Sequence, residues 1–240
     1  MAWKEHPELD LLIPNLVGPR RYNKRQPCVY CGGQNESKGH VIPKTLYREI
    51  DRKIIQMLTV GSCNICNSDK KAKLYTFLRD CLVVDIDVKR HPIAGELFET
   101  DFMRTMKEGH TGTFEQFYKG RPVALNRWDG EGLELGWAIE IDDQSLLGAV
   151  KYITQGMHWD VFGEVTHRDS VSVYLIPRGD RREFMMRSSG LSLFRGYFRQ
   201  GEQFTSVFGQ SEDGRVLWHH IFFDTMLFIG FSQGSVPTTS

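Results

Sequence analysis

The amino-acid sequence predicts an α+β protein in two parts, a small module followed by a larger α+β domain with a central antiparallel sheet. Four of the five cysteines stand in two Cys-x-x-Cys pairs within the first 66 residues. Beyond position 91, helical patterns precede several segments rich in β-branched and aromatic residues, as expected for strands packed beside helices. The module is predicted over residues 27–82, after an N-terminal arm over 1–26, and the domain over 91–240.

The arm is rich in Pro and Arg and has only the short apolar stretch Leu11 to Ile13. The N-terminus lacks the apolar core of a signal peptide, and the apolar run from Met226 to Phe231 is too short to span a bilayer. We therefore expect a cytoplasmic protein that does not bind membranes.

The cysteine pairs have the spacing of a closed tetrahedral zinc site. Each Cys-x-x-Cys pair forms a tight turn whose sulfurs converge, so one ion can join two distant parts of a short chain. The fifth cysteine, Cys81, has no partner at such a spacing, which favours metal binding in a reducing compartment over disulfides. The predicted ligands of a structural Zn²⁺ are Cys28, Cys31, Cys63 and Cys66.

Between the two pairs, the sequence predicts a turn, a short strand, Pro43 and a helical or irregular stretch. A helix is predicted from Ser68 to Leu82, because Leu74, Leu78 and other apolar residues follow at helical spacing. Asn67 and Ser68 are candidate caps of this helix.

The second part is predicted to contain helices over residues 96–107 and 145–157 and a loop over 111–136, rich in Gly and charge. The predicted strands cover residues 171–176, 183–187, 203–209 and 216–229, the last being one bent strand or two.

The net charge of zero conceals an asymmetry between the two parts. Residues 1–90 hold 16 Lys and Arg against 10 Asp and Glu, a balance of +6, so the remainder carries −6. Basic side chains flank both cysteine pairs and suit phosphate contacts, although a solvated charged face is the simpler alternative. The residues predicted to bind nucleic acid are Arg20, Arg21, Lys24, Arg25, Lys44, Lys70 and Lys71.

The order of these pieces carries a family resemblance. The first cysteine pair is followed by Gly39-His40-Val41-Ile42-Pro43-Lys44, and the second by Asn67 and, four residues later, Lys71. This series resembles the ββα-metal motif of HNH endonucleases, in the branch that carries a zinc knuckle of two Cys-x-x-Cys pairs. The resemblance covers residues 27–82.

The resemblance implies a metal-dependent endonuclease that hydrolyses phosphodiester bonds in nucleic acid, with DNA the expected kind. It makes His40 the general base that deprotonates the attacking water, a task that suits a neutral imidazole. It makes Asn67 a ligand of a catalytic Mg²⁺ or Mn²⁺ through its side-chain oxygen. A zinc bound by four sulfurs has no open position and is expected to be structural.

The sequence departs from the family at two positions. Gly39 stands where most members carry a metal-binding Asp or Glu, and Leu58 stands where an asparagine orients the histidine. Candidates to replace the acid are Glu36 and Asp69, and candidates to orient His40 are Thr59 and Asn64.

These departures leave an alternative open, a catalytically decayed zinc module that only binds nucleic acid. His40 is then a structural histidine and Asn67 a helix cap. A module for protein contacts is disfavoured by the +6 balance. His219 and His220 point to opposite faces of a strand and are expected to serve packing. Residues 91–240 are expected to serve regulation or homo-oligomer formation.

Overall fold

The computed structural model describes residues 22–85, 91–104, 121–126, 133–138, 142–176, 180, 194–211, 213–224 and 226–233. Most of the predicted arm and the predicted strand over 183–187 lie outside these residues. Within them, no helix has both the length and the apolar composition needed to cross a membrane.

The first part contains a two-stranded antiparallel hairpin and a long helix. In the hairpin, His40 at the end of the first strand pairs with Thr59 at the start of the second. The helix predicted after the second cysteine pair is confirmed and extends to Asp85. The elements are β1 (Ser37–His40), the short 3-10 helix η2 (Lys44–Leu46), α2 (Glu49–Ile54), β2 (Thr59–Ser62) and α3 (Asp69–Asp85).

The second part contains the predicted antiparallel sheet, which confirms the α+β fold class. Its five strands lie in the order β5-β9-β8-β7-β6, and every neighbouring pair is antiparallel. The segment predicted as one bent strand or two is two strands, joined by a turn in which Phe223 and Asp224 have positive φ. The strands are β5 (Val171–Leu175), β6 (Phe194–Gln200), β7 (Phe204–Gln210), β8 (Arg215–Phe222) and β9 (Met226–Gln233).

Two expectations for this part need correction. The predicted loop over 111–136 contains a strand and overlaps a second one, β3 (Arg121–Asn126) and β4 (Leu133–Ala138), which form a separate hairpin. The predicted helix over 96–107 begins earlier, as α4 (Pro92–Leu97), and continues as the π-helix η3 (Phe98–Phe102). Pro at the first helical position explains the earlier start, because its missing N–H would be unsatisfied there anyway.

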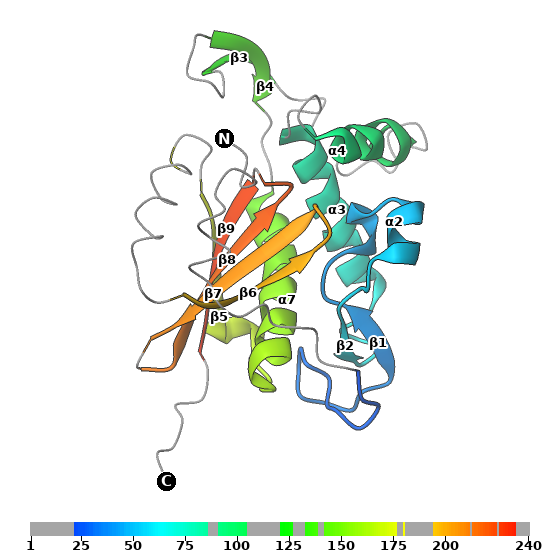
Figure 1. Cartoon of the computed structure of the whole chain (residues 1–240), viewed down its shortest axis with the longest axis vertical. Helices are drawn as coiled ribbons and strands as arrows, with labels where there is room; N and C mark the ends of the chain where they lie inside the picture. The colour runs from blue at the N-terminus through cyan, green and yellow to red at the C-terminus, as the bar shows by residue number, and fades with distance from the viewer. Residues whose placement is uncertain are drawn as a thin grey trace.

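The helix α7 (Asp143–Phe162) lies between the sheet and the first part. It contacts β5 and β9 on one side and α3 on another, and Figure 1 shows it behind the sheet, beside the blue hairpin. The Asp142 side chain accepts a hydrogen bond from the Gln144 N–H at its start, and Gly163 ends it at φ 76°. Because it faces apolar neighbours on more than one side, buried residues surround much of the helix.

One continuous hydrophobic core joins the two predicted parts. It includes Val41 and Leu78 from the first part and Val150, Phe204 and Trp218 from the second. The bounds 27–82 and 91–240 therefore describe segments that pack together, and their status as separate domains stays a prediction.

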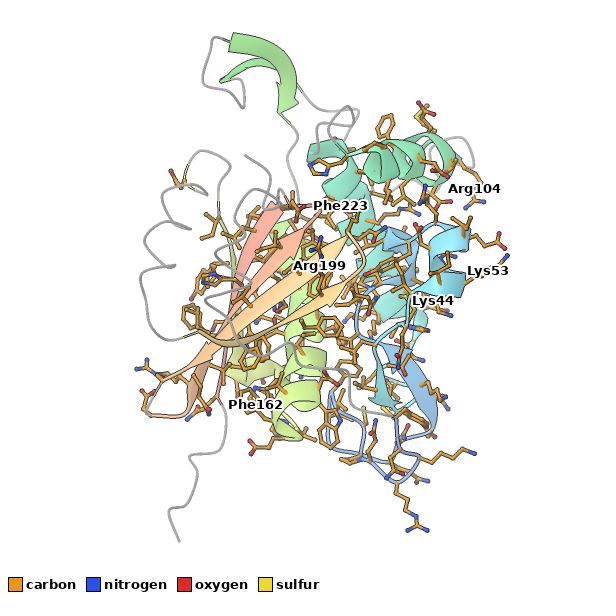
Figure 2. The ribbon with its side chains drawn as sticks, in the orientation of Figure 1. Lys44, Lys53, Arg104, Phe162, Arg199 and Phe223 are labelled. Atoms are coloured by element: carbon orange, nitrogen blue, oxygen red, sulfur yellow. The ribbon has the colours of Figure 1, made fainter. Side chains whose placement is uncertain are left out.

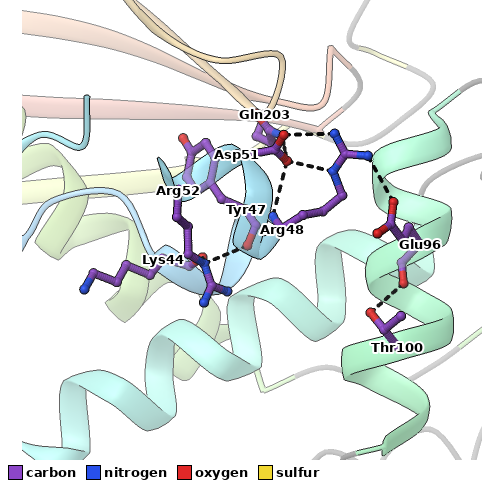
Figure 3. A network of polar contacts seen from close by, with 8 residues as sticks. All are labelled: Lys44, Tyr47, Arg48, Asp51, Arg52, Glu96, Thr100 and Gln203. Atoms are coloured by element: carbon purple, nitrogen blue, oxygen red, sulfur yellow. Dashed lines mark hydrogen bonds and ion pairs between the residues drawn. The ribbon is translucent and has the colours of Figure 1, made fainter. Parts of the chain in front are cut away.

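Polar contacts also join the two parts. Gln200, at the end of β6, accepts two hydrogen bonds. Its backbone carbonyl accepts from the Tyr47 hydroxyl at 3.1 Å, and its side-chain oxygen accepts from the Leu58 N–H at 2.9 Å. Arg48 holds Asp51 with two nitrogens at 2.8 and 2.9 Å and reaches Glu96 of α4 at 3.0 Å (Figure 3). These contacts fix the segment that connects β1 to β2.

Two buried histidines, His158 and His220, lie between α7 and the sheet. His220 bonds Thr154 of α7 and Ser206 of β7, each at 2.9 Å, and His158 of α7 bonds Ser232 of β9 at 2.9 Å. His219, on the adjacent position of β8, is 1% exposed. The packing role predicted for His219 and His220 agrees with this burial.

Candidate metal centre and catalytic site

The four cysteines of the two pairs converge in one cluster. Their sulfurs all lie within 4.8 Å of one another, and the Sγ atoms of Cys31 and Cys63 are 3.8 Å apart. A tetrahedral zinc with Zn–S bonds of about 2.3 Å has sulfurs roughly 3.8 Å apart. The cluster therefore fits a zinc ion closed by four thiolates, as the sequence predicts.

Tight turns aim these sulfurs inward. In the first turn, the Gly32 N–H donates to the Cys28 carbonyl at 2.8 Å, with Gly32 at φ 75°, where glycine is favoured. In the second, the Cys66 N–H points at the Cys63 sulfur at 3.4 Å. Burial raises the pKa of Cys28, but hydrogen bonds from backbone N–H groups outweigh it and lower the pKa to about 7. That thiol is thus prepared to bind metal as a thiolate.

His40 is the last residue of β1 and is half-buried. Its Nδ1 atom is buried without a hydrogen-bond partner among the described residues, which leaves Nε2 as the nitrogen that can meet solvent. Burial, followed by the charges of Lys44 and Lys71, lowers the pKa of His40 to about 4. The ring is therefore neutral at pH 7 and able to accept a proton.

Asn67 is exposed and is tied to the same strand. Its side-chain nitrogen donates to the Ser37 hydroxyl at 3.2 Å and to the Lys38 carbonyl at 3.4 Å. Its Oδ1 lies 3.5 Å from the point that a β-carbon on Gly39 would occupy. Asn67 thus contacts the first half of β1, and its oxygen approaches Gly39, the residue before His40.

Lys71 was predicted to contact phosphate, but it is only 3% exposed. It therefore does not belong to the set of surface residues that can bind nucleic acid. Its Nζ donates to the His40 carbonyl at 3.1 Å and to the Tyr30 hydroxyl at 2.8 Å. It also lies over the rings of Tyr30, Tyr75 and Tyr152, at 4.1, 5.1 and 5.6 Å from their centroids. Burial lowers the pKa of Lys71 to about 7, against the opposing influence of nearby thiols.

The remaining basic residues of the prediction divide by position. Lys24, Arg25, Lys44 and Lys70 are exposed, while Arg20 and Arg21 lie outside the described residues. Figure 2 shows Lys44 on the same side of the molecule as Lys53 of α2. The Arg52 side chain donates to the Lys44 carbonyl at 3.0 Å and so fixes the backbone of Lys44 (Figure 3).

Lys38 was missed by the sequence analysis. It is exposed, and its Nζ lies 4.8 Å from the centre of the Tyr22 ring. Its place in β1, two residues before His40, was the available signal.

The two departures from the family have distinct structural outcomes. Leu58 is buried and takes part in backbone bonding, since its carbonyl accepts from the Val41 N–H at 3.1 Å. Of the two acid candidates, Glu36 accepts a hydrogen bond from the Asn64 N–H at 2.7 Å, and Asp69 is exposed in the first turn of α3.

The residues around Gly39 do not fit a hard divalent cation. A β-carbon at this position would meet the Ser62 β-carbon at 3.1 Å, and the Asn67 oxygen and the Lys71 Nζ each at 3.5 Å. Mg²⁺ and Mn²⁺ favour carboxylate and other oxygen ligands, whereas this point has one amide oxygen and an ammonium group beside it. In the described segments, the four cysteines are the only group of three or more His, Cys, Asp or Glu that could hold a metal.

Comparisons with models of protein families, with curated proteins and with solved structures find no match to this chain. The described structure thus shows a four-cysteine cluster suited to Zn²⁺ in an α+β fold.

Proposed function

We propose that this chain is an HNH-type endonuclease that hydrolyses phosphodiester bonds in nucleic acid, with His40 as the general base. The observation that carries the proposal is a half-buried imidazole at the end of β1 that is neutral at pH 7. Burial, followed by the charges of Lys44 and Lys71, lowers the pKa of His40 to about 4. Such a site suits an anionic substrate whose reaction needs a proton acceptor.

The chemistry assigned to His40 is proton removal from water. Its Nε2 accepts the proton while the water oxygen attacks phosphorus, the bond from phosphorus to the leaving oxygen breaks, and that oxygen takes a proton from solvent. Lys44 is exposed and can meet a non-bridging phosphate oxygen, where negative charge grows in the transition state. A bound phosphodiester also raises the pKa of His40, because a nearby anion favours imidazolium, and this makes the ring a stronger base.

Exposed basic side chains on the same part of the chain support a nucleic-acid substrate. Lys24, Arg25, Lys38 and Lys70 belong to the zinc-binding part and can neutralise backbone phosphates on either side of the reacting one. These contacts do not distinguish DNA from RNA. We propose DNA as the substrate and include RNA in the test.

A second candidate function is nucleic-acid binding without cleavage. It is favoured by Gly39, which offers no acid, and by Lys71, whose side-chain nitrogen lies 3.5 Å from the point that a β-carbon at position 39 would occupy. The zinc cluster and the exposed lysines would then present a binding surface, and His40 would have no chemical task.

The test separates cleavage from binding. Zinc-loaded protein is incubated with labelled duplex DNA, single-stranded DNA and RNA, with magnesium, manganese or neither, and binding is measured in parallel by fluorescence anisotropy. We expect His40→Ala to reduce the cleavage rate by about 100-fold or more, with an unchanged Kd, zinc content and melting temperature. Equal cleavage by the parent and His40→Ala would mean contamination and would reject the nuclease. Binding without cleavage by the parent would establish the second candidate.

A further inference from the structure

We propose that the Lys71 amine occupies the place of a divalent cation behind Gly39, next to the His40 backbone, and keeps Mg²⁺ and Mn²⁺ from binding there. The inference rests on the proposed function, because it concerns the same site, but its test needs no nucleic acid. It changes the expected cofactor requirement from two metals to zinc alone.

The first argument is position. The Lys71 Nζ and the Asn67 Oδ1 each lie 3.5 Å from the same point, the β-carbon position of Gly39. The amine therefore comes from α3 into the space that a side chain at position 39 would enter. A cation bound by Asn67 at this end of β1 would lie next to another positive charge.

The second argument is that the hydrogen bonds and ring contacts of the amine suit an ammonium group. The His40 carbonyl can only accept a hydrogen bond, so the Lys71 nitrogen must donate to it. The three tyrosine rings present aromatic faces, which attract an ammonium group. Among the described residues, no carboxylate forms a hydrogen bond or an ion pair with the Lys71 amine. The anionic groups that favour its charged form are the thiolates of Cys28 and Cys66.

The third argument is the absence of ligands to compete with this charge. Gly39 has no side chain, and the Glu36 carboxylate is engaged by the backbone of Asn64. Asn67 contributes a neutral oxygen only. A divalent cation would have to displace or approach an ammonium group without a carboxylate in compensation.

These points give Lys71 a defined task in the proposed reaction. Because it is buried, it does not touch substrate, and it acts through its bond to the His40 carbonyl and through its field at the end of β1. It is thus a positioning residue. Its positive charge would attract the phosphodiester, as a bound metal ion would. The attack on that phosphodiester comes from the water that His40 deprotonates.

The test measures manganese binding by electron paramagnetic resonance in zinc-loaded protein without nucleic acid. The variants are Lys71→Met, Gly39→Asp and the double variant Gly39→Asp/Lys71→Met, with Gly39→Asn/Lys71→Met as the matched control that adds the same bulk without charge. We expect no specific Mn²⁺ binding by the parent, and binding at least about tenfold tighter in the double variant than in Gly39→Asp. Zinc content and melting temperature confirm that each variant is folded.

A measurement on the parent chain removes dependence on any variant that does not fold. Paramagnetic broadening by Mn²⁺ is followed at the NMR signals of His40 and Asn67. Signals unchanged at stoichiometric Mn²⁺ support the proposal. Selective broadening of both signals that Asn67→Ala abolishes would overturn the proposal. It would also be overturned if Gly39→Asp bound Mn²⁺ with the same affinity as Gly39→Asp/Lys71→Met. An inactive protein that shows no Mn²⁺ binding would reject the nuclease and leave this assignment standing.

Discussion

Gly156 of α7 lies against Val41 so closely that a β-carbon on the glycine would be 2.6 Å from both γ-carbons of the valine. Val41 is fully buried and follows His40 directly in the sequence. The helix of the second part therefore determines where the proposed base of the first part can lie. The Gln155 side chain of the same helix reinforces this contact, because it reaches the Tyr30 carbonyl at 3.4 Å.

Gly156→Ala should therefore damage the site from a distance. Alanine favours a helix over glycine by up to about 1 kcal/mol, but overpacking against Val41 costs about 1–3 kcal/mol, so we expect net destabilisation. The His40 ring signals should shift in NMR spectra. Gly148→Ala is the matched control on the same helix, since its β-carbon would meet the Arg168 side-chain end at 3.0 Å, and that end can move. Urea unfolding in which both variants are equally stable would contradict the expectation.

Zinc should be present at one ion per chain and should be lost on Cys63→Ser. Binding free energy of a structural zinc contributes to folding, so the melting temperature should fall together with the zinc content. Cys81→Ser is the control, because Cys81 is buried on α3 outside the four-sulfur cluster. Atomic absorption and thermal melting measure both properties. A Cys63→Ser protein with its zinc retained would exclude this ligand set.

Acid should destabilise the protein between about pH 6.5 and pH 4 through three buried histidines of α7 and β8. Burial lowers the pKa of His158 and of His219 to about 4, and burial together with the charge of His219 lowers that of His220 to about 3. As the pH falls below 6.5 the unfolded chain takes up these protons first, so the free energy of unfolding decreases, and above 6.5 the three contribute no pH dependence.

The measurement is urea unfolding at a series of pH values. Zinc release in acid also destabilises the chain, and the variant His220→Asn separates the two effects because it keeps the zinc ligands. The slope of the unfolding free energy against pH is proportional to the number of protons taken up on unfolding. We expect that number to be smaller by about one in His220→Asn. An unchanged slope would exclude His220 from the acid transition.

Nucleic-acid affinity should depend on exposed basic residues near His40. Lys44→Gln together with Lys70→Gln should weaken binding and flatten the dependence of log Kd on log salt by about one unit for each phosphate contact removed. Arg199→Gln is the control, since Arg199 is an exposed residue of β6 in the sheet (Figure 2). A larger effect of the control would place the nucleic acid on the second part instead.

Local patterns were sufficient to predict much of this fold. The spacing of the cysteines predicted the four-sulfur cluster, and helical periodicity predicted α3 and most of α7. These features depend on neighbours within a few residues, so they can be inferred without knowing the packing. Strand β6 and the hairpin of β3 and β4 were missed, because Gly and charged residues obscure their alternation.

Lys71 shows where such inference stops. Beside Lys70 and Lys73 it looked like one of three surface lysines, and its helical spacing to the buried Tyr75 and Leu78 was the one signal of its inward orientation. Its burial requires Tyr30 from the first cysteine turn and Tyr152 from α7, which are distant in sequence and meet only when the two parts pack together. The cysteines thus define a metal cluster through local spacing, whereas the charge beside His40 is set by long-range packing that no local pattern encodes.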